Sequence, residues 1–186
     1  MTRWLLILLL LVQPALADVR FKTKGASFTL VAGKEADKFK LLDGKGKTVA
    51  TYKLKKDLVL VSDGQHKEVY KLKRKPDGFD VRGPDTKGKR LFLFRRKDKT
   101  DWNIADGREV RVMTVRLRKG AYELDDKAVS KVRLQGDKLA FLDKAGKGAG
   151  ELTGSKDLEA GLWMGVGRFD PALRGGLFLY LSKLDH

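Results

Sequence analysis

The 186-residue chain contains no cysteine, one asparagine and two histidines. The lack of cysteine excludes disulfides, thiol nucleophiles and thiolate metal ligands. The asparagine, Asn103, is followed by Ile104 and Ala105, so there is no N-glycosylation sequon. Secreted eukaryotic domains often carry disulfides or such sequons. For an exported chain, their joint absence favours the bacterial envelope.

Groups that carry chemistry are also scarce. His66 follows Asp63-Gly64 and His186 is the last residue, and neither has a partner at zinc-site spacing. There is no Gly-x-Ser-x-Gly motif. Aspartates recur at turn positions, where we interpret them as turn caps. Calcium loops would need denser alternating acids. The sequence therefore predicts no catalytic residue, no metal and no cofactor.

The one long apolar run lies at the N-terminus. Arg3 precedes nine apolar residues, Trp4 to Val12, and Ala15-Leu16-Ala17 has the small-x-small form of a cleavage site. The run is too short to cross a bilayer, which takes about 20 residues. We therefore predict a signal peptide at residues 1–17, export to the periplasm or outside the cell, and no transmembrane segment in the mature chain. The alternative is an uncleaved anchor or a buried N-terminal helix.

Acidic residues are outnumbered, with 24 Asp and Glu against 40 Lys and Arg, which gives a net charge of +16. Removal of residues 1–17 takes away Arg3 and no acid, so the mature charge is +15. Such a charge draws a protein toward polyanions. The expected partners are anionic lipid, lipopolysaccharide or another acidic envelope polymer, or else a protein. Nucleic acid would match the charge, but export argues against it.

A phrase of alternating apolar and basic residues recurs along the mature chain. Its copies are Tyr52-Lys53-Leu54-Lys55-Lys56, Tyr70-Lys71-Leu72-Lys73-Arg74, Phe92-Leu93-Phe94-Arg95-Arg96, Val115-Arg116-Leu117-Arg118-Lys119 and Val132-Arg133-Leu134-Gln135. Successive copies begin 17 to 23 residues apart. Turn signals lie between them, including the pairs Asp43-Gly44, Asp63-Gly64, Asp77-Gly78 and Asp106-Gly107. Asp-Gly pairs tolerate the positive φ of tight hairpins.

This alternation predicts half-buried strands. Two strands and two turns take about twenty residues, so each repeat is predicted to be one β-hairpin. From Asp37 to Asp157 we count six hairpins, roughly twelve strands, and residues 18–32 are a candidate for one more pair. Because a lone hairpin cannot bury its apolar face, we expect an antiparallel meander that closes into a barrel or splits into two layers. The predicted fold class is mainly β, a closed or nearly closed barrel of roughly twelve strands with a C-terminal hydrophobic helix.

The pattern changes after residue 154. Ser155 is a candidate cap for a short helix, and Asp170-Pro171 provides an N-cap followed by proline at the first helical position. From Ala172 to Leu181 the apolar residues surround the helix axis, which predicts burial on every side. A closed barrel would enclose such a helix, whereas the alternative is packing on one sheet face or at an interface. The mature chain, residues 18–186, is thus predicted to be one β-rich domain, with hairpin repeats at 18–154 and a helical segment at 155–186.

This layout resembles the tubby-like barrel, which is shared by tubby domains, plant LURP-one-related proteins and phospholipid scramblases. The resemblance covers Asp37 to Leu184 and rests on the hairpin phrases and on Phe169-Asp170-Pro171 through Leu181. It implies a twelve-stranded barrel around a central hydrophobic helix and an association with membrane lipid, in tubby domains through basic surface residues. No lipid-binding residue of the family maps onto a numbered position here, and the export signal departs from the cytoplasmic members.

The basic side chains of the repeats are the candidate binding residues. Alternate strand residues share a face, so seven cations are expected on one surface: Lys53, Lys55, Lys71, Lys73, Arg95, Arg116 and Arg118. Like charges in register repel, so either interleaved acids or a polyanionic partner must stabilise them. We expect a non-enzymatic envelope protein that binds an anionic surface or a protein partner. The alternatives are a carrier of a small apolar ligand or lipid inside the barrel, and a carboxylate-dependent hydrolase that uses His66.

Overall fold

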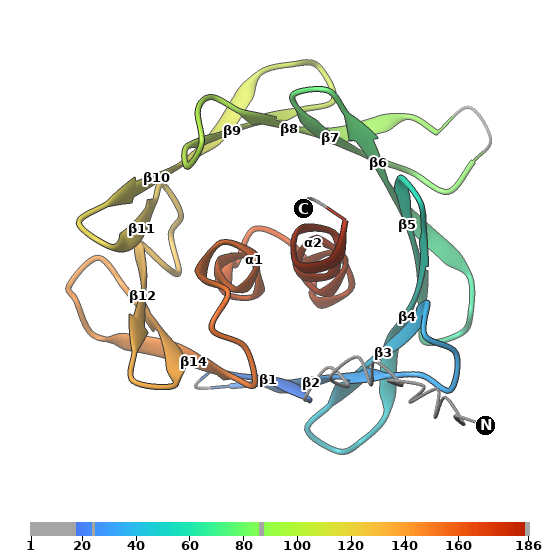
Figure 1. The fold of residues 1–186 in the computed structure, drawn as a ribbon, viewed down its shortest axis with the longest axis horizontal. Helices are drawn as coiled ribbons and strands as arrows, with labels where there is room; N and C mark the ends of the chain where they lie inside the picture. The colour runs from blue at the N-terminus through green and yellow to red at the C-terminus, as the bar shows by residue number, and fades with distance from the viewer. Residues whose placement is uncertain (1–17, 24, 86–87, 185–186) are drawn as a thin grey trace, which may run out of the picture.

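The computed structural model describes residues 18–23, 25–85 and 88–184, and the predicted signal peptide lies outside them. The strands are β1 (Val19–Thr23), β2 (Ser27–Ala32), β3 (Lys38–Asp43), β4 (Thr48–Lys55), β5 (Leu58–Asp63), β6 (Glu68–Lys75), β7 (Gly78–Arg82), β8 (Arg90–Arg96), β9 (Trp102–Asp106), β10 (Arg111–Arg118), β11 (Ala121–Leu124), β12 (Lys131–Gln135), β13 (Lys138–Leu142) and β14 (Gly148–Thr153). Each pairs with the next in an antiparallel meander. Strand β1 also pairs with β14, which closes the sheet into a barrel (Figure 1).

The sequence repeat corresponds to these hairpins. Twelve strands, β3 to β14, lie between Asp37 and Asp157, and β1 with β2 forms the additional pair. Every copy of the repeated phrase lies on an even-numbered strand from β4 to β12. Residues at its first and third positions face the barrel interior and those at its second position face outward, as buried Val115 and exposed Arg116 illustrate on β10. The predicted closed antiparallel barrel is confirmed, with fourteen strands among the described residues.

Four turns at one end of the barrel share one geometry. They begin at Asp43, Asp63, Asp106 and Asp143. Each carboxylate accepts backbone N–H bonds of 2.9–3.0 Å from the residues two and four positions further on. The residue three positions on has a positive φ, at Gly46, His66, Glu109 and Gly146. These aspartates are therefore turn caps, as interpreted from the sequence, and we call this the Asp-turn end of the barrel.

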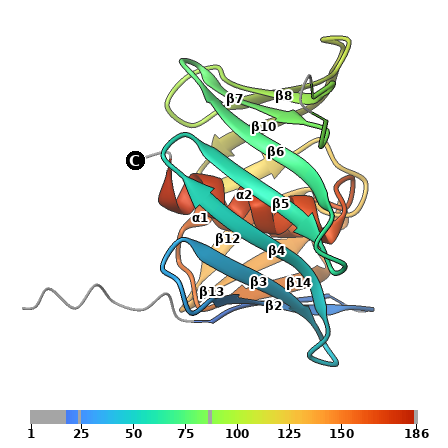
Figure 2. The same ribbon diagram turned by 90° about the vertical axis from the view of Figure 1, so that its right-hand side faces the viewer.

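Two helices lie inside the ring of strands (Figure 1). Helix α1 (Leu158–Leu162) is capped by Asp157, whose Oδ1 accepts a 2.9 Å bond from the N–H of Ala160. The predicted cap was wrong by two residues, because Ser155 instead accepts a bond from the N–H of Asp157. A 3₁₀ turn, η1 (Trp163–Gly165), follows. Helix α2 (Pro171–Lys183) begins at the predicted cap, Asp170, and runs along the barrel axis away from the Asp-turn end (Figure 2).

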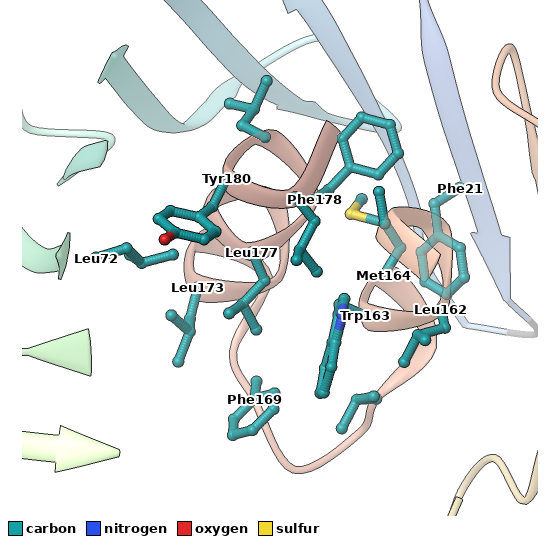
Figure 3. Packing of buried hydrophobic residues seen from close by; sticks show 14 of the residues in the cluster. Phe21, Leu72, Leu162, Trp163, Met164, Phe169, Leu173, Leu177, Phe178 and Tyr180 are labelled. Carbon is teal, nitrogen blue, oxygen red and sulfur yellow. The ribbon is translucent and has the colours of Figure 1, made fainter. Parts of the chain in front are cut away.

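The apolar surface of α2 is buried on every side. The exposed fraction is at most 1% for Leu173, Leu177, Phe178 and Tyr180. These side chains pack against Trp163 and Met164 of η1 and against inward-facing strand residues such as Leu72 (Figure 3). The prediction of an enclosed helix is therefore confirmed. Within the part of the chain that the structure describes, no helix has both the length and the hydropathy needed to cross a membrane.

Candidate functional site

The seven predicted cations lie on the outer surface of the barrel, but most of them are not direct neighbours. Lys53 on β4 is opposite Leu60 on β5, and Leu60 is in turn opposite Lys71 on β6. The neighbouring row has the same order, Lys55, Leu58 and Lys73. The odd-numbered strand thus inserts an aliphatic residue between the cations of two repeats, which creates alternating basic and apolar strips.

Directly opposed like charges occur where sequence reasoning did not expect them. The pairs are Lys38 with Lys53, Lys71 with Arg82, and Arg82 with Arg90. Such pairs are destabilising in a sheet. We call Lys38, Lys53, Lys71, Arg82 and Arg90 the cationic belt. It crosses the outer wall from β3 to β8 and is interrupted by Leu60 alone.

Acidic side chains compensate part of this charge. Glu35 lies 2.6 Å from the Nζ of Lys38, and Glu68 lies 3.0 Å from the Nζ of Lys71. Of the predicted cations outside the belt, Arg95 pairs with Asp77 and Arg118 with Asp101. Four predicted cations have no carboxylate within 4.0 Å among the described residues: Lys53, Lys55, Lys73 and Arg116.

Asp80 on β7 provides the compensation at the other end of the belt. It is on the outer face, opposite Lys73 and Leu93, yet its side chain is fully buried. Its carboxylate lies 2.9 Å from Arg82, 3.7 Å from Arg90 and 3.8 Å from Lys75. Arg90 also pairs with Glu109 at 2.6 Å, so two acids serve three cations and the local charge stays positive.

A groove of about 480 Å³, within the range of small-ligand sites, opens beside the belt on β3 to β5. Its cations are Lys34, Lys38, Lys40 and Lys53. Its hydroxyl groups come from Thr51 and Ser62, and Leu60 contributes an aliphatic surface. The two acids of the lining, Glu35 and Glu68, already form the ion pairs described above. The groove therefore has a net positive charge.

The wall formed by β11 to β14 is more evenly charged. Lys131 pairs with Glu123 at 3.5 Å, and Lys138 pairs with Glu151 at 2.7 Å. The hydrogen bond and charge of Lys138 hold the pKa of Glu151 below its ordinary value. Residues 121–153 contain six acids and six bases, whereas residues 38–96 contain seven acids and eighteen bases, so the excess of positive charge is concentrated on the β3–β8 wall.

The histidine considered for catalysis, His66, is at the edge of the groove. His66 lies in the β5–β6 turn, and its imidazole forms no hydrogen bond with the described residues. It shares the edge of the groove with Glu68. Among residues 18–23, 25–85 and 88–184, no three His, Asp or Glu side chains are grouped to hold a metal ion.

The centre of the barrel is where a carrier would hold an apolar ligand. In this protein the centre is filled by α2, since the side chains of Leu173, Leu177 and Phe178 are packed there (Figure 3). The hydroxyl of Tyr52 donates a 3.0 Å hydrogen bond to the Ala172 carbonyl and ties this helix to the wall. An apolar ligand would have to displace the helix to occupy the centre.

Comparisons with known proteins give little beyond this description. No protein-family model matches the chain, and no curated protein matches it either. Among solved structures, it is similar to an Arabidopsis thaliana protein determined by X-ray crystallography, with a TM-score of 0.40 and 22% identity. The alignment covers 56% of this chain and 74% of the plant protein. The class of the protein, a closed antiparallel β-barrel around a buried helix, follows from the strand pairing itself.

Proposed function

We propose that the protein is an exported, non-enzymatic component of the cell envelope, and that its β3–β8 wall attaches it to an anionic membrane surface. The observation that carries this proposal is the cationic belt, in which Lys38 and Lys53, Lys71 and Arg82, and Arg82 and Arg90 are directly opposed. This arrangement costs stability in an isolated sheet. An anionic surface would offset that cost.

The strips between the cations favour a membrane over nucleic acid. Leu58 and Leu60 are half-buried between basic side chains, so the surface combines charge with aliphatic groups. Proteins that bind single-stranded nucleic acid use aromatic stacking. Three aromatic side chains of the strands are not available for stacking, because Trp102 and Tyr122 are buried and Phe92 is half-buried.

The tubby-like resemblance supports the same proposal. The family layout is a barrel around a hydrophobic helix, and this chain encloses α2 in that way. The strand count differs from the twelve of the family, because β1 and β2 add a pair. We propose that the likeness extends to lipid association through basic surface residues.

Co-sedimentation with vesicles tests the proposal. We expect binding to vesicles that contain phosphatidylglycerol and none to pure phosphatidylcholine. Each cation near an anionic surface contributes about 1 kcal/mol, so Lys53→Glu/Lys55→Glu/Lys73→Glu should weaken binding at least tenfold. These three lysines form no ion pair with the described residues, so the reversal leaves the fold's ion pairs in place. Binding should fall as ionic strength rises toward about 1 M, where the Debye length is about 3 Å.

The matched control reverses three cations elsewhere on the surface. Arg20, Arg133 and Lys144 are exposed, lie away from the β3–β8 wall and form no ion pair with the described residues. Their triple reversal to Glu makes the same change in net charge. An equal loss of vesicle binding in both triple variants would show that only the net charge matters. It would reject the assignment of binding to the β3–β8 wall. Equal binding to both kinds of vesicle would reject the anionic surface.

A further inference from the structure

A second cavity, of about 540 Å³, opens at the Asp-turn end of the barrel. It lies between the inner helices and the β1–β2, β11–β12 and β13–β14 connections. Its apolar lining includes Phe28, Ala128, Ala149 and Pro171. The one cation among its described lining residues is Arg174 on α2. One acid, Asp143, also lines the cavity, and its carboxylate accepts backbone N–H bonds from Ala145 and Lys147. The cavity is thus a largely apolar space with one cation and one carboxylate.

Most of the N–H donors of the Arg174 guanidinium form only long hydrogen bonds. Its Nε donates a hydrogen bond of 2.6 Å to the carbonyl oxygen of Phe169. The two terminal nitrogens make only 3.5 Å contacts, with the carbonyls of Met164 and Gly167, at the long limit for a hydrogen bond. No carboxylate of the described residues lies within 4.0 Å of the guanidinium. The terminal N–H groups are therefore available to a planar anion.

The nearby acids do not take the place of such a partner. Burial lowers the pKa of Arg174, while the more distant charges of Asp126 and Asp170 oppose that effect. The carboxylate of Asp126 accepts bonds from the N–H groups of Ala128 and Val129. The carboxylate of Asp170 caps α2 and accepts a hydrogen bond from the hydroxyl of Tyr70. A partly buried cation without a paired anion is costly, and a bound anion would remove that cost.

We infer that this cavity binds an amphipathic monocarboxylate of the fatty-acid class, with the carboxylate on Arg174 and the alkyl chain against Phe28, Ala128 and Pro171. The volume lies within the usual range for small-ligand sites, about 300–1,000 Å³. A monoanion matches the single guanidinium. A phosphate dianion would bring a second negative charge near Asp126, Asp143 and Asp170. The site is separate from the outer wall and does not depend on the function proposed for it.

Calorimetric titration of the purified protein with four probes tests the inference: decanoate, 1-decanol, acetate and decyl phosphate. We expect decanoate to bind at least tenfold more tightly than each of the others. Hydrogen bonds to charged groups are worth about 1.5–3 kcal/mol, so Arg174→Gln should weaken decanoate binding at least tenfold and leave 1-decanol unchanged. Glutamine retains an amide donor for the Phe169 carbonyl.

A second pair of variants separates ligand binding from the structural role of Arg174. Ala128 is exposed at the cavity and Ala145 is exposed outside its lining. Ala128→Phe should block decanoate, while Ala145→Phe should leave its affinity unchanged. Three results would overturn the inference: no binding of decanoate, equal affinity for decanoate and 1-decanol, or tighter binding of decyl phosphate.

Discussion

The hydroxyl of Tyr52 on β4 donates a 3.0 Å hydrogen bond to the carbonyl oxygen of Ala172 in the first turn of α2. Gly175 makes this approach possible, because a Cβ at that position would lie 2.2 Å from the Tyr52 hydroxyl oxygen and 2.8 Å from its Cζ. The glycine therefore allows the enclosed helix to lie against the barrel wall. It has this effect although glycine is a poor helix former.

Gly175→Ala should lower the free energy of unfolding. Overpacking a filled core costs about 1–3 kcal/mol, which exceeds the gain of about 1 kcal/mol from alanine's helix propensity. Gly176→Ala is the matched control, since its Cβ would lie 3.0 Å from the Cγ2 of Val61, at the end of a side chain. Urea unfolding monitored by circular dichroism measures both. A smaller loss for Gly175→Ala than for Gly176→Ala would contradict the proposed packing.

Tyr52→Phe should partly rescue Gly175→Ala. By itself Tyr52→Phe removes one hydrogen bond, worth about 1 kcal/mol, from a ring that is 2% exposed. In the double variant the 2.2 Å contact with the hydroxyl oxygen is absent, and only the 2.8 Å contact with Cζ remains. The combined loss should therefore be smaller than the sum of the two single losses, which a double-mutant cycle tests. Simple additivity would show that the two side chains do not compete for this space.

Much of the barrel follows from local patterns. Strand alternation and turn chemistry act over a few residues, so the twelve strands between Asp37 and Asp157 could be predicted from them. The cap at Asp170 followed by Pro171 is equally local. The enclosure of α2 required one more step, since a helix that is apolar all round needs a container.

The cationic belt could not be predicted, because it depends on strand register. The pairing shifts by one residue between Leu41 and Leu42, and again between Val61 and Ser62. Such bulges change which residues are opposite one another and have no clear sequence signal here. The proximity of Asp80 to Arg90 likewise arises only once β7 and β8 are paired.

Asp80→Asn should destabilise the barrel by about 2–3 kcal/mol. Removal of one partner from a buried ion pair costs about 3–5 kcal/mol, and the loss is smaller here because Lys75, Arg82 and Arg90 are partly exposed. Added salt should recover part of the loss by screening the three cations. Asp77→Asn is the control, as its 3.5 Å pair with Arg95 is exposed and should be worth at most about 1 kcal/mol. Similar losses from both variants would argue against a special role of Asp80.

The shared geometry of the Asp turns predicts that glycine is favoured at each positive-φ position, so that introducing and removing glycine should have opposite effects on stability. His66 has a φ of 64° where the turn after Asp43 has Gly46 with a φ of 78°. A left-handed conformation costs a side-chain-bearing residue about 1–2 kcal/mol, and glycine's extra flexibility costs about 0.5–1 kcal/mol. His66→Gly should therefore stabilise the protein by about 0.5–1 kcal/mol, and Gly46→His should destabilise it similarly. A thermal unfolding series tests both, and a loss of stability in His66→Gly would refute the argument.

Because three tyrosines are buried or half-buried, we predict that the folded protein loses stability at alkaline pH. Burial is the largest cause that raises the pKa of Tyr52, Tyr70 and Tyr122, and the Asp170 charge adds to the effect at Tyr70. In the unfolded chain a tyrosine has a pKa of about 10. Above that pH the unfolded state releases protons that the folded state retains, so the stability is fully present below about pH 10 and decreases as the pH rises further.

Absorbance titration of phenolate measures this directly. Tyr52, Tyr70 and Tyr122 of the folded protein should titrate well above the pH at which tyrosines titrate in urea. Tyr70→Phe tests the contribution of the contact with Asp170, since the hydroxyl of Tyr70 donates to the residue that caps α2. The variant should show a smaller decrease of unfolding free energy above about pH 10 than the parent protein, because one fewer group is linked to unfolding. An unchanged slope in Tyr70→Phe, with normal tyrosine titration in the folded parent, would mean that these hydroxyl groups are accessible to solvent and do not hold the helix against the wall.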